Sequence, residues 1–164
     1  MNKRIVLVSL FLFLAFSLLF GCAIGTSTDL STGQKTDNKG LSFEETYLTV
    51  DGVKLSNNEV QMGKVLKVNF DGITGFNLDS NKLVRPGMSM QVVSVQGEEI
   101  LFAENLLSNY TQNGLSPLFA ASLNSTLTIG NPMKIGESYE VSIRIWDDLS
   151  ENEINSKITI LVVE

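Results

Sequence analysis

Four acidic side chains near the C-terminus have the type and spacing that could bind a metal ion. Asp147, Asp148, Glu151 and Glu153 crowd one polar loop between two apolar segments. Carboxylate oxygens are the ligands that Ca²⁺ prefers, and a full site takes about six to eight oxygens. The cluster lacks a regular alternation of acids, and acidic residues of an exposed hairpin are usually just solvated. We therefore expect solvated acids here, with calcium bound by these four residues as the alternative.

Trp146 is the only tryptophan and directly precedes this acidic loop. Strand alternation places its side chain on the face of Glu140, Ser142 and Arg144, opposite an apolar row. An exposed tryptophan among polar groups can stack on a sugar ring or anchor a protein partner. The strand can also twist at its end, so that Trp146 covers the core. We expect the second arrangement and keep ligand contact by Trp146 as the alternative.

Catalysis by histidine is excluded, because the chain contains no histidine. Histidine-based triads and zinc sites with histidine ligands are therefore absent. Hydrolysis by two carboxylates, as in glycosidases, needs two acids that converge in a cleft. No pair of acids in the sequence points to such a cleft. We expect a protein that is not an enzyme, with a carboxylate-dependent hydrolase as an alternative.

Cys22 is the only cysteine, so the chain beyond it cannot form a disulfide. Before it lie a basic start, with Lys3 and Arg4, and an apolar segment over residues 5–20. This order of basic, apolar and small residues is typical of a secretory signal peptide. The apolar segment is shorter than the about 20 residues that a membrane-spanning helix needs. The sequence therefore predicts export.

The stretch Leu19-Phe20-Gly21-Cys22 resembles the lipobox of bacterial lipoprotein precursors. The resemblance implies that residues 1–21 are a signal peptide and that Cys22 becomes a lipidated N-terminus, carrying diacylglyceryl and often palmitate. It also implies a protein anchored in the cell envelope, at the periplasmic face of the outer membrane in a Gram-negative organism. Two alternatives stay open. Cleavage after Ala23 would release a soluble secreted protein, and an uncleaved segment would itself be the anchor.

The charge and the composition after the signal peptide bear on partners and order. Loss of Lys3 and Arg4 leaves 10 basic and 18 acidic residues, a net charge of 10 − 18 = −8. An acidic surface argues against a nucleic-acid partner. Residues 22–40 are rich in Ser, Thr, Gly and charge and lack aromatic residues. They predict a flexible tether behind the lipidated N-terminus.

Residues 41–164 show the pattern of a single all-β domain. Short alternating segments recur with turn signals between them, and no long amphipathic helix interrupts them. About seven or eight strands predict a β-sandwich. The segment 104–122 is the exception, and we interpret it as a long crossover with a helical turn that caps an open end of the fold.

The end of the chain carries a second resemblance. Residues 136–147, in which Tyr139, Val141, Ile143 and Ile145 share one face, are followed by a polar loop and a strand at 157–163. This arrangement resembles the last strand pair of immunoglobulin-like domains of the fibronectin, cadherin and polycystic-kidney-repeat type. The resemblance implies an immunoglobulin-like sandwich with Tyr139 in its core.

Together these observations favour a membrane-anchored, non-catalytic β-sandwich module. We expect it to bind a protein partner or to have a structural role in the cell envelope. A carbohydrate-binding domain that uses Trp146 is the alternative. No cofactor is expected beyond the covalent lipid on Cys22, apart from the calcium alternative above.

Overall fold

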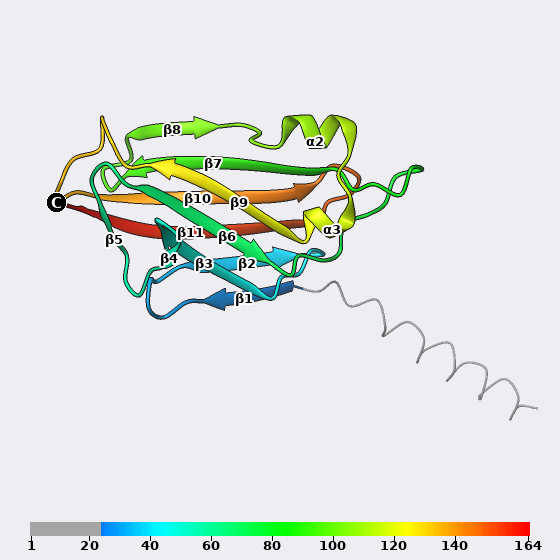
Figure 1. Ribbon diagram of the computed structural model, residues 1–164, viewed down its shortest axis with the longest axis horizontal. Coiled ribbons are helices and arrows are strands. Elements are labelled where there is room, and N and C mark those ends of the chain that lie inside the picture. Colours follow the sequence, from blue (N-terminus) through cyan, green and yellow to red (C-terminus); the bar gives the residue numbers. More distant parts are fainter. Residues whose placement is uncertain (1–23) are drawn as a thin grey trace, which may run out of the picture.

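Alternation of buried and exposed side chains along the strands produces two facing β-sheets, seen in the computed structural model, which describes residues 24–164 (Figure 1). The larger sheet contains, in spatial order, β1 (Ile24–Thr28), β2 (Lys35–Lys39), β11 (Glu153–Val163), β10 (Ser138–Asp147), β7 (Pro86–Ser94) and β8 (Glu99–Ala103), and β5 (Glu59–Gln61) pairs in parallel with β11. The smaller sheet contains β4 (Val53–Lys54), β3 (Glu45–Val50), β6 (Val65–Asp71) and β9 (Ser122–Thr128). The expected all-β sandwich is confirmed.

The core lies between the inner faces of the two sheets. Phe70 of β6 and Leu48 of β3 are fully buried against side chains of the larger sheet such as Met88, Val141 and Ile160. Full burial of one such side chain stabilises a fold by about 1.5–3 kcal/mol. The larger sheet is therefore held firmly from its inner side, and its outer face is a rigid platform for exposed residues.

Residues 24–39 correct the expectation of a flexible tether. They form β1 and β2, and β2 pairs antiparallel with β11 from Lys35–Lys157 to Lys39–Glu153. Thr36 is buried in this strand, and its hydroxyl lies 2.9 Å from the hydroxyl of buried Ser156. The charged residues of β2 lie on its exposed face, so a polar composition reflects the solvent-facing side of a strand here and not disorder. The sandwich thus begins at residue 24.

The described chain contains eleven strands, more than the seven or eight expected, because of β1, β2 and the short β5. The crossover over 104–122 is confirmed in outline and contains two short helices, α2 (Ser108–Asn113) and α3 (Pro117–Ala120). They lie at one end of the sandwich (Figure 1). No helix among residues 24–164 is long and apolar enough to cross a membrane. The predicted signal peptide and Cys22 lie outside the described residues.

The predicted pairing of the last two strands is confirmed. β10 and β11 are antiparallel neighbours from Ser138–Leu161 to Trp146–Glu153, and β10 also pairs with β7. Tyr139 is buried, and its hydroxyl accepts a hydrogen bond of 2.9 Å from the backbone N–H of Lys134. Burial raises the pKa of this hydroxyl, which also donates to the carboxylate of Glu137. β10 is therefore paired with a strand on each side, and hydrogen bonds hold the side chain of Tyr139 in place.

Candidate functional site

Trp146 lies on the outer face of the larger sheet, and the expectation that it covers the core is wrong. Its cross-strand neighbour on β7 is Gly87. A Cβ atom built on Gly87 would lie 2.1 Å from Cε2 of Trp146, so the indole rests directly on the glycine backbone. Only glycine leaves room for the ring in this position. Trp146 is half-buried as a result, with its other side on the open sheet face.

Two charged residues lie beside the indole. The guanidinium carbon of Arg144 lies 5.3 Å from the centre of the Trp146 ring, within the range of a cation–π contact. Nε of Arg144 donates a 2.8 Å hydrogen bond to Oε2 of Glu153, the cross-strand partner of Trp146 on β11. Nδ2 of Asn155 donates to the other carboxylate oxygen of Glu153 at 3.1 Å. The ring is thereby fixed in one orientation before any ligand arrives.

The same contacts set the charge of Glu153. Burial acts to raise the pKa of this carboxyl, but the hydrogen bonds from Arg144 and Asn155 outweigh it and hold the pKa below its ordinary value. Glu153 is therefore ionised at neutral pH. Beside the indole, the outer face of the larger sheet thus carries the guanidinium of Arg144, the carboxylate of Glu153 and the amide of Asn155. Each of these groups can form two hydrogen bonds with neighbouring hydroxyls of a ligand.

The surface around Trp146 is polar and open. The strand register brings outward-facing side chains of neighbouring strands into rows, and those nearest to the indole all carry hydrogen-bonding groups. They are Ser89 of β7, Ser142 and Arg144 of β10, Glu153, Asn155 and Lys157 of β11, and Asp37 and Lys39 of β2. The candidate site is therefore a platform with one aromatic ring among polar groups.

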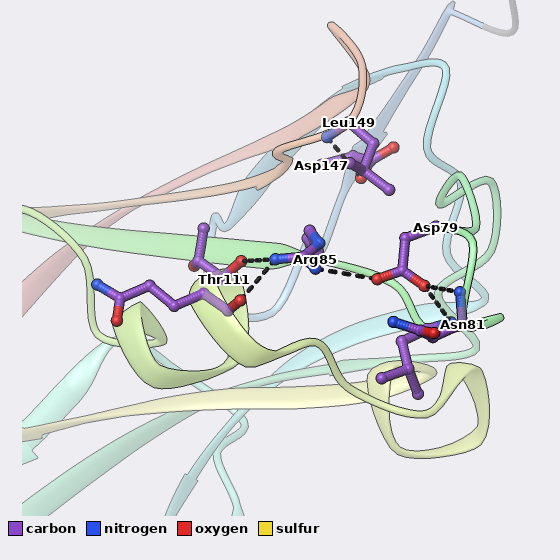
Figure 2. A network of polar contacts seen from close by, with 8 residues as sticks. Asp79, Asn81, Arg85, Thr111, Asp147 and Leu149 are labelled. Atoms are coloured by element: carbon purple, nitrogen blue, oxygen red, sulfur yellow. Dashed lines mark hydrogen bonds and ion pairs between the residues drawn. The ribbon is translucent and has the colours of Figure 1, made fainter.

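Asp147, the next residue along β10, is fully buried and turns toward the inside of the sandwich. Its carboxylate accepts hydrogen bonds from the backbone N–H of Asn77 at 3.0 Å and of Leu149 at 3.2 Å. The hydroxyl of Ser150 donates to it at 2.7 Å. Figure 2 shows the Asp147 carboxylate directed at Leu149. This aspartate closes the loop after β10 and ties it to the loop around Asn77.

The four acids proposed as calcium ligands do not converge. Asp147 is buried, whereas the exposed Glu151 forms a 3.2 Å ion pair with Lys39. Glu153 turns to the outer face and pairs with Arg144. Within residues 24–164, no group of three or more Asp, Glu, Cys or His side chains is placed to hold a metal ion. The calcium alternative therefore has no geometric support from these residues.

Asp79, in the loop before β7, forms an ion pair with Arg85. Nη2 of Arg85 donates to Asp79 at 3.0 Å, and Nη1 of Arg85 donates to the backbone carbonyls of Thr111 at 3.2 Å and Gln112 at 2.6 Å (Figure 2). Hydrogen bonds from the backbone of Leu83 and Asn81, and then from Arg85, lower the pKa of Asp79. Arg85 thus links the loop over residues 76–83 to α2. Asp79 and Asp147 thus both accept hydrogen bonds from side chains of the chain itself, Asp79 from Arg85 and Asp147 from Ser150.

The outer face of the smaller sheet holds a hollow that the sequence did not indicate. It has a volume of about 460 Å³ and is lined by Tyr47, Thr49, Lys67, Asn69 and Thr126, among others. At one end of this face Asp71 accepts hydrogen bonds from the hydroxyl of Tyr47 at 2.8 Å and from that of Ser122 at 2.5 Å. These bonds, that from Ser122 first, lower the pKa of Asp71. The network links three strands of the smaller sheet.

Comparisons with known proteins concern the fold only. No family model matches the chain, and no curated protein matches its sequence. Among solved structures it is similar to the C-terminal domain of wzt, with 12% sequence identity and a TM-score of 0.46. That similarity covers 76% of this chain and 74% of the other. What the fold and the site define is an all-β sandwich with an open polar platform around one tryptophan.

Proposed function

We propose that this protein is a lipid-anchored, non-catalytic module of the bacterial cell envelope that binds a carbohydrate on the outer face of its larger sheet. The observation that carries the proposal is the indole of Trp146, which rests on Gly87 beside Arg144 and Glu153. An aromatic ring offers an apolar surface to the C–H face of a sugar, and neighbouring charged groups bind its hydroxyls.

The composition of the platform favours a sugar over a protein at this face. The centres of protein interfaces are depleted in charged residues and contain several apolar anchors. Around Trp146 the outward side chains are instead charged or polar, including Asp37, Lys39 and Asn155. The hydroxyls of a bound sugar can replace the water molecules that are hydrogen-bonded to these polar side chains. Such a surface therefore suits a hydroxyl-rich ligand.

The direct test is a glycan array probed with residues 22–164. We expect binding to at least one glycan class, and we expect Trp146→Ala to weaken it more than about tenfold. Phe119→Ala is the matched control, because Phe119 is an exposed aromatic residue of α3, outside the larger sheet that carries the platform. Unchanged binding in Trp146→Ala, or equal loss in both variants, would remove the platform from the proposal.

Attachment to the membrane is the second part of the proposal, and it depends on the lipobox resemblance at Leu19–Cys22. Two or three acyl chains at Cys22 would hold the protein on a bilayer, because each buried methylene contributes about 0.8 kcal/mol. Mass spectrometry of the mature N-terminus tests this directly. A chain that starts unmodified at Ile24 would show that the protein is secreted without an anchor.

A protein partner is the second candidate, and one observation favours it. β8 is an edge strand of the larger sheet, and its Leu101 and Phe102 are 39% and 56% exposed. An exposed edge strand with apolar side chains can accept a strand from another protein. Cross-linking from position 102 in intact cells would capture such a partner, and loss of the captured species in Phe102→Ser would support this candidate.

A further inference from the structure

The predicted lipid anchor has a defined place relative to the sandwich, because β1 begins two residues after Cys22. β1 starts at Ile24, so only Ala23 separates the two residues. Two residues of extended chain span at most about 7 Å. Figure 1 shows that β1 starts at the end of the sandwich that carries α2, α3 and the loop over residues 76–83. A lipid on Cys22 would therefore hold this end of the domain close to the bilayer.

The two helices at this end, α2 and α3, belong to an uncharged part of the sequence. Charged residues make up 18% of the chain, yet none occurs in residues 105–133, between Glu104 and Lys134. This segment includes α2, α3 and β9. Moving a charged side chain from water into an apolar phase is the most costly part of such a contact. Because this segment has no charged side chain, its contact with an apolar phase avoids that cost.

Large apolar side chains of this segment are exposed. Leu118 and Phe119 of α3 are 79% and 68% exposed, and Tyr110 of α2 is 42% exposed. Tyr110 and Phe119 line a hollow of about 530 Å³ together with Leu107, Leu115, Ser122, Leu123 and Asn124. No lining residue is charged. We call this surface, formed by Leu107, Tyr110, Leu115, Leu118 and Phe119, the uncharged corner.

The opposite end of the sandwich is different. Its exposed apolar residues occur singly on separate turns, and they include Leu30, Val53, Val95 and Ile135. Single exposed apolar residues are normal on protein surfaces, whereas adjacent ones with a shared hollow are unusual. Charged residues accompany them, such as Asp29 beside Leu30 and Lys54 beside Val53. Among residues 24–164, the adjacent exposed pair Leu118 and Phe119 therefore has no counterpart at the opposite end.

We infer that the uncharged corner rests on the bilayer that holds the lipidated Cys22, with Leu118 and Phe119 at the boundary between headgroups and acyl chains. This inference depends on the proposed anchor. Apolar and aromatic side chains enter that boundary by about 5–10 Å. The domain as a whole is acidic, so the contact depends on apolar burial and not on attraction to anionic headgroups, and it is insensitive to salt.

The orientation also bears on the carbohydrate platform. Trp146, Glu153, Lys39 and Ile24 lie in one row across β10, β11, β2 and β1. Neighbouring strands are about 4.8 Å apart, so Trp146 lies roughly 14 Å from the start of β1. The platform therefore begins at the membrane-proximal edge of the domain. It is placed to bind sugars close to the membrane surface.

The test uses the full precursor, processed in a lipid-modifying host and reconstituted in phosphatidylcholine vesicles. Because Cys22 is the only cysteine and its sulfur is consumed by lipidation, an introduced cysteine is the only thiol to be labelled. Leu118→Cys and Leu30→Cys would each carry an environment-sensitive fluorophore. Leu30, 94% exposed in the β1–β2 turn, is the matched control. The readout is quenching by a phospholipid with a nitroxide near its headgroup.

The expected result is roughly threefold stronger quenching at position 118 than at position 30, because residue 30 lies beyond the far end of β1. Equal quenching at both positions, in protein that floats with the vesicles, would overturn the inference and leave the anchor intact. Protein that fails to float would overturn the anchor, and the inference with it.

A protein that covers the corner would give a different result. In native membranes the label at position 118 would then be shielded from water-soluble iodide but unaffected by the nitroxide lipid, which contradicts contact with the bilayer. Leu118→Glu with Phe119→Glu gives an independent readout. These side chains are exposed, so the fold is retained, and we expect quenching of a label at position 116 to fall to the level of position 30.

Discussion

Trp146 and Asp147 are neighbours on β10, and each has the environment that would be expected for the other. The aromatic residue lies on the polar outer face of the larger sheet, resting on Gly87. The carboxylate is fully buried on the inner face and accepts hydrogen bonds from Asn77, Leu149 and Ser150. The period of two along the strand decides which face each side chain occupies, and side-chain chemistry does not.

Asp147 stabilises the fold, whereas Trp146 has a side chain that is available to a ligand. The buried carboxylate has three hydrogen bonds from its own chain and serves the fold. The indole, by contrast, is held in place by Gly87, Arg144 and Glu153 while one side stays on the open face. Substitutions at Asp147 should therefore act on stability alone, whereas substitutions at or beneath Trp146 should also act on binding.

Loss of the buried carboxylate has the largest expected effect. We expect Asp147→Ala to lower the free energy of unfolding by about 3 kcal/mol, because three donors lose their acceptor at a buried position. Urea denaturation measures the loss. Asp148→Ala is the matched control, since Asp148 is exposed, and should change the stability by less than about 0.5 kcal/mol. Equal losses in both variants would contradict the comparison.

The glycine beneath the indole comes next. Gly87→Ala introduces a Cβ at 2.1 Å from Trp146, so the ring must move. We expect the free energy of unfolding to fall by about 2 kcal/mol and carbohydrate binding to weaken. Gly130→Ala is the control, because a Cβ at Gly130 meets nothing within 4 Å. Normal binding in Gly87→Ala would show that the position of the ring does not matter for the ligand.

The contribution of Glu153, the carboxylate beside the indole, to stability should depend on pH. The pKa of Glu153 is lower in the folded protein than in the unfolded chain, since hydrogen bonds from Arg144 and Asn155 outweigh burial. Its contribution to stability is therefore complete above the unfolded pKa of about 4.3 and is lost as the pH falls through the folded pKa. We expect Glu153→Gln to cost about 1 kcal/mol at pH 7 and less at pH 3. A cost that does not change between these pH values would contradict this account.

The smallest effect is expected at the exposed end of the acidic loop. Glu151 is 91% exposed in its ion pair with Lys39, so Glu151→Ala should change the stability by less than about 0.5 kcal/mol. Millimolar Ca²⁺ should leave the melting temperature unchanged in the wild type and in this variant. A rise in melting temperature with Ca²⁺ that disappears in Glu151→Ala would establish the calcium site that the geometry disfavours.

Local alternation was sufficient to predict the sandwich and the β10–β11 pair, because Tyr139 to Ile145 share one face in sequence and in structure. The same rule places Asp147 inside, although its carboxylate suggested solvent. The contact of Trp146 with Gly87 was beyond prediction, since it depends on the register between strands distant in the sequence. Residues 24–39 were misjudged because the polar outer face of β2 has the composition of a linker.

The fluorescence of Trp146 tests the central claim most directly, because this is the only indole in the chain. The protein would be titrated with the strongest glycan of the array, and binding would be followed in parallel by calorimetry. A sugar stacked on the ring predicts a saturable change in emission whose midpoint equals the calorimetric dissociation constant, and a weaker midpoint in Gly87→Ala. Calorimetric binding with no change in emission would show that the sugar binds elsewhere and would contradict the account.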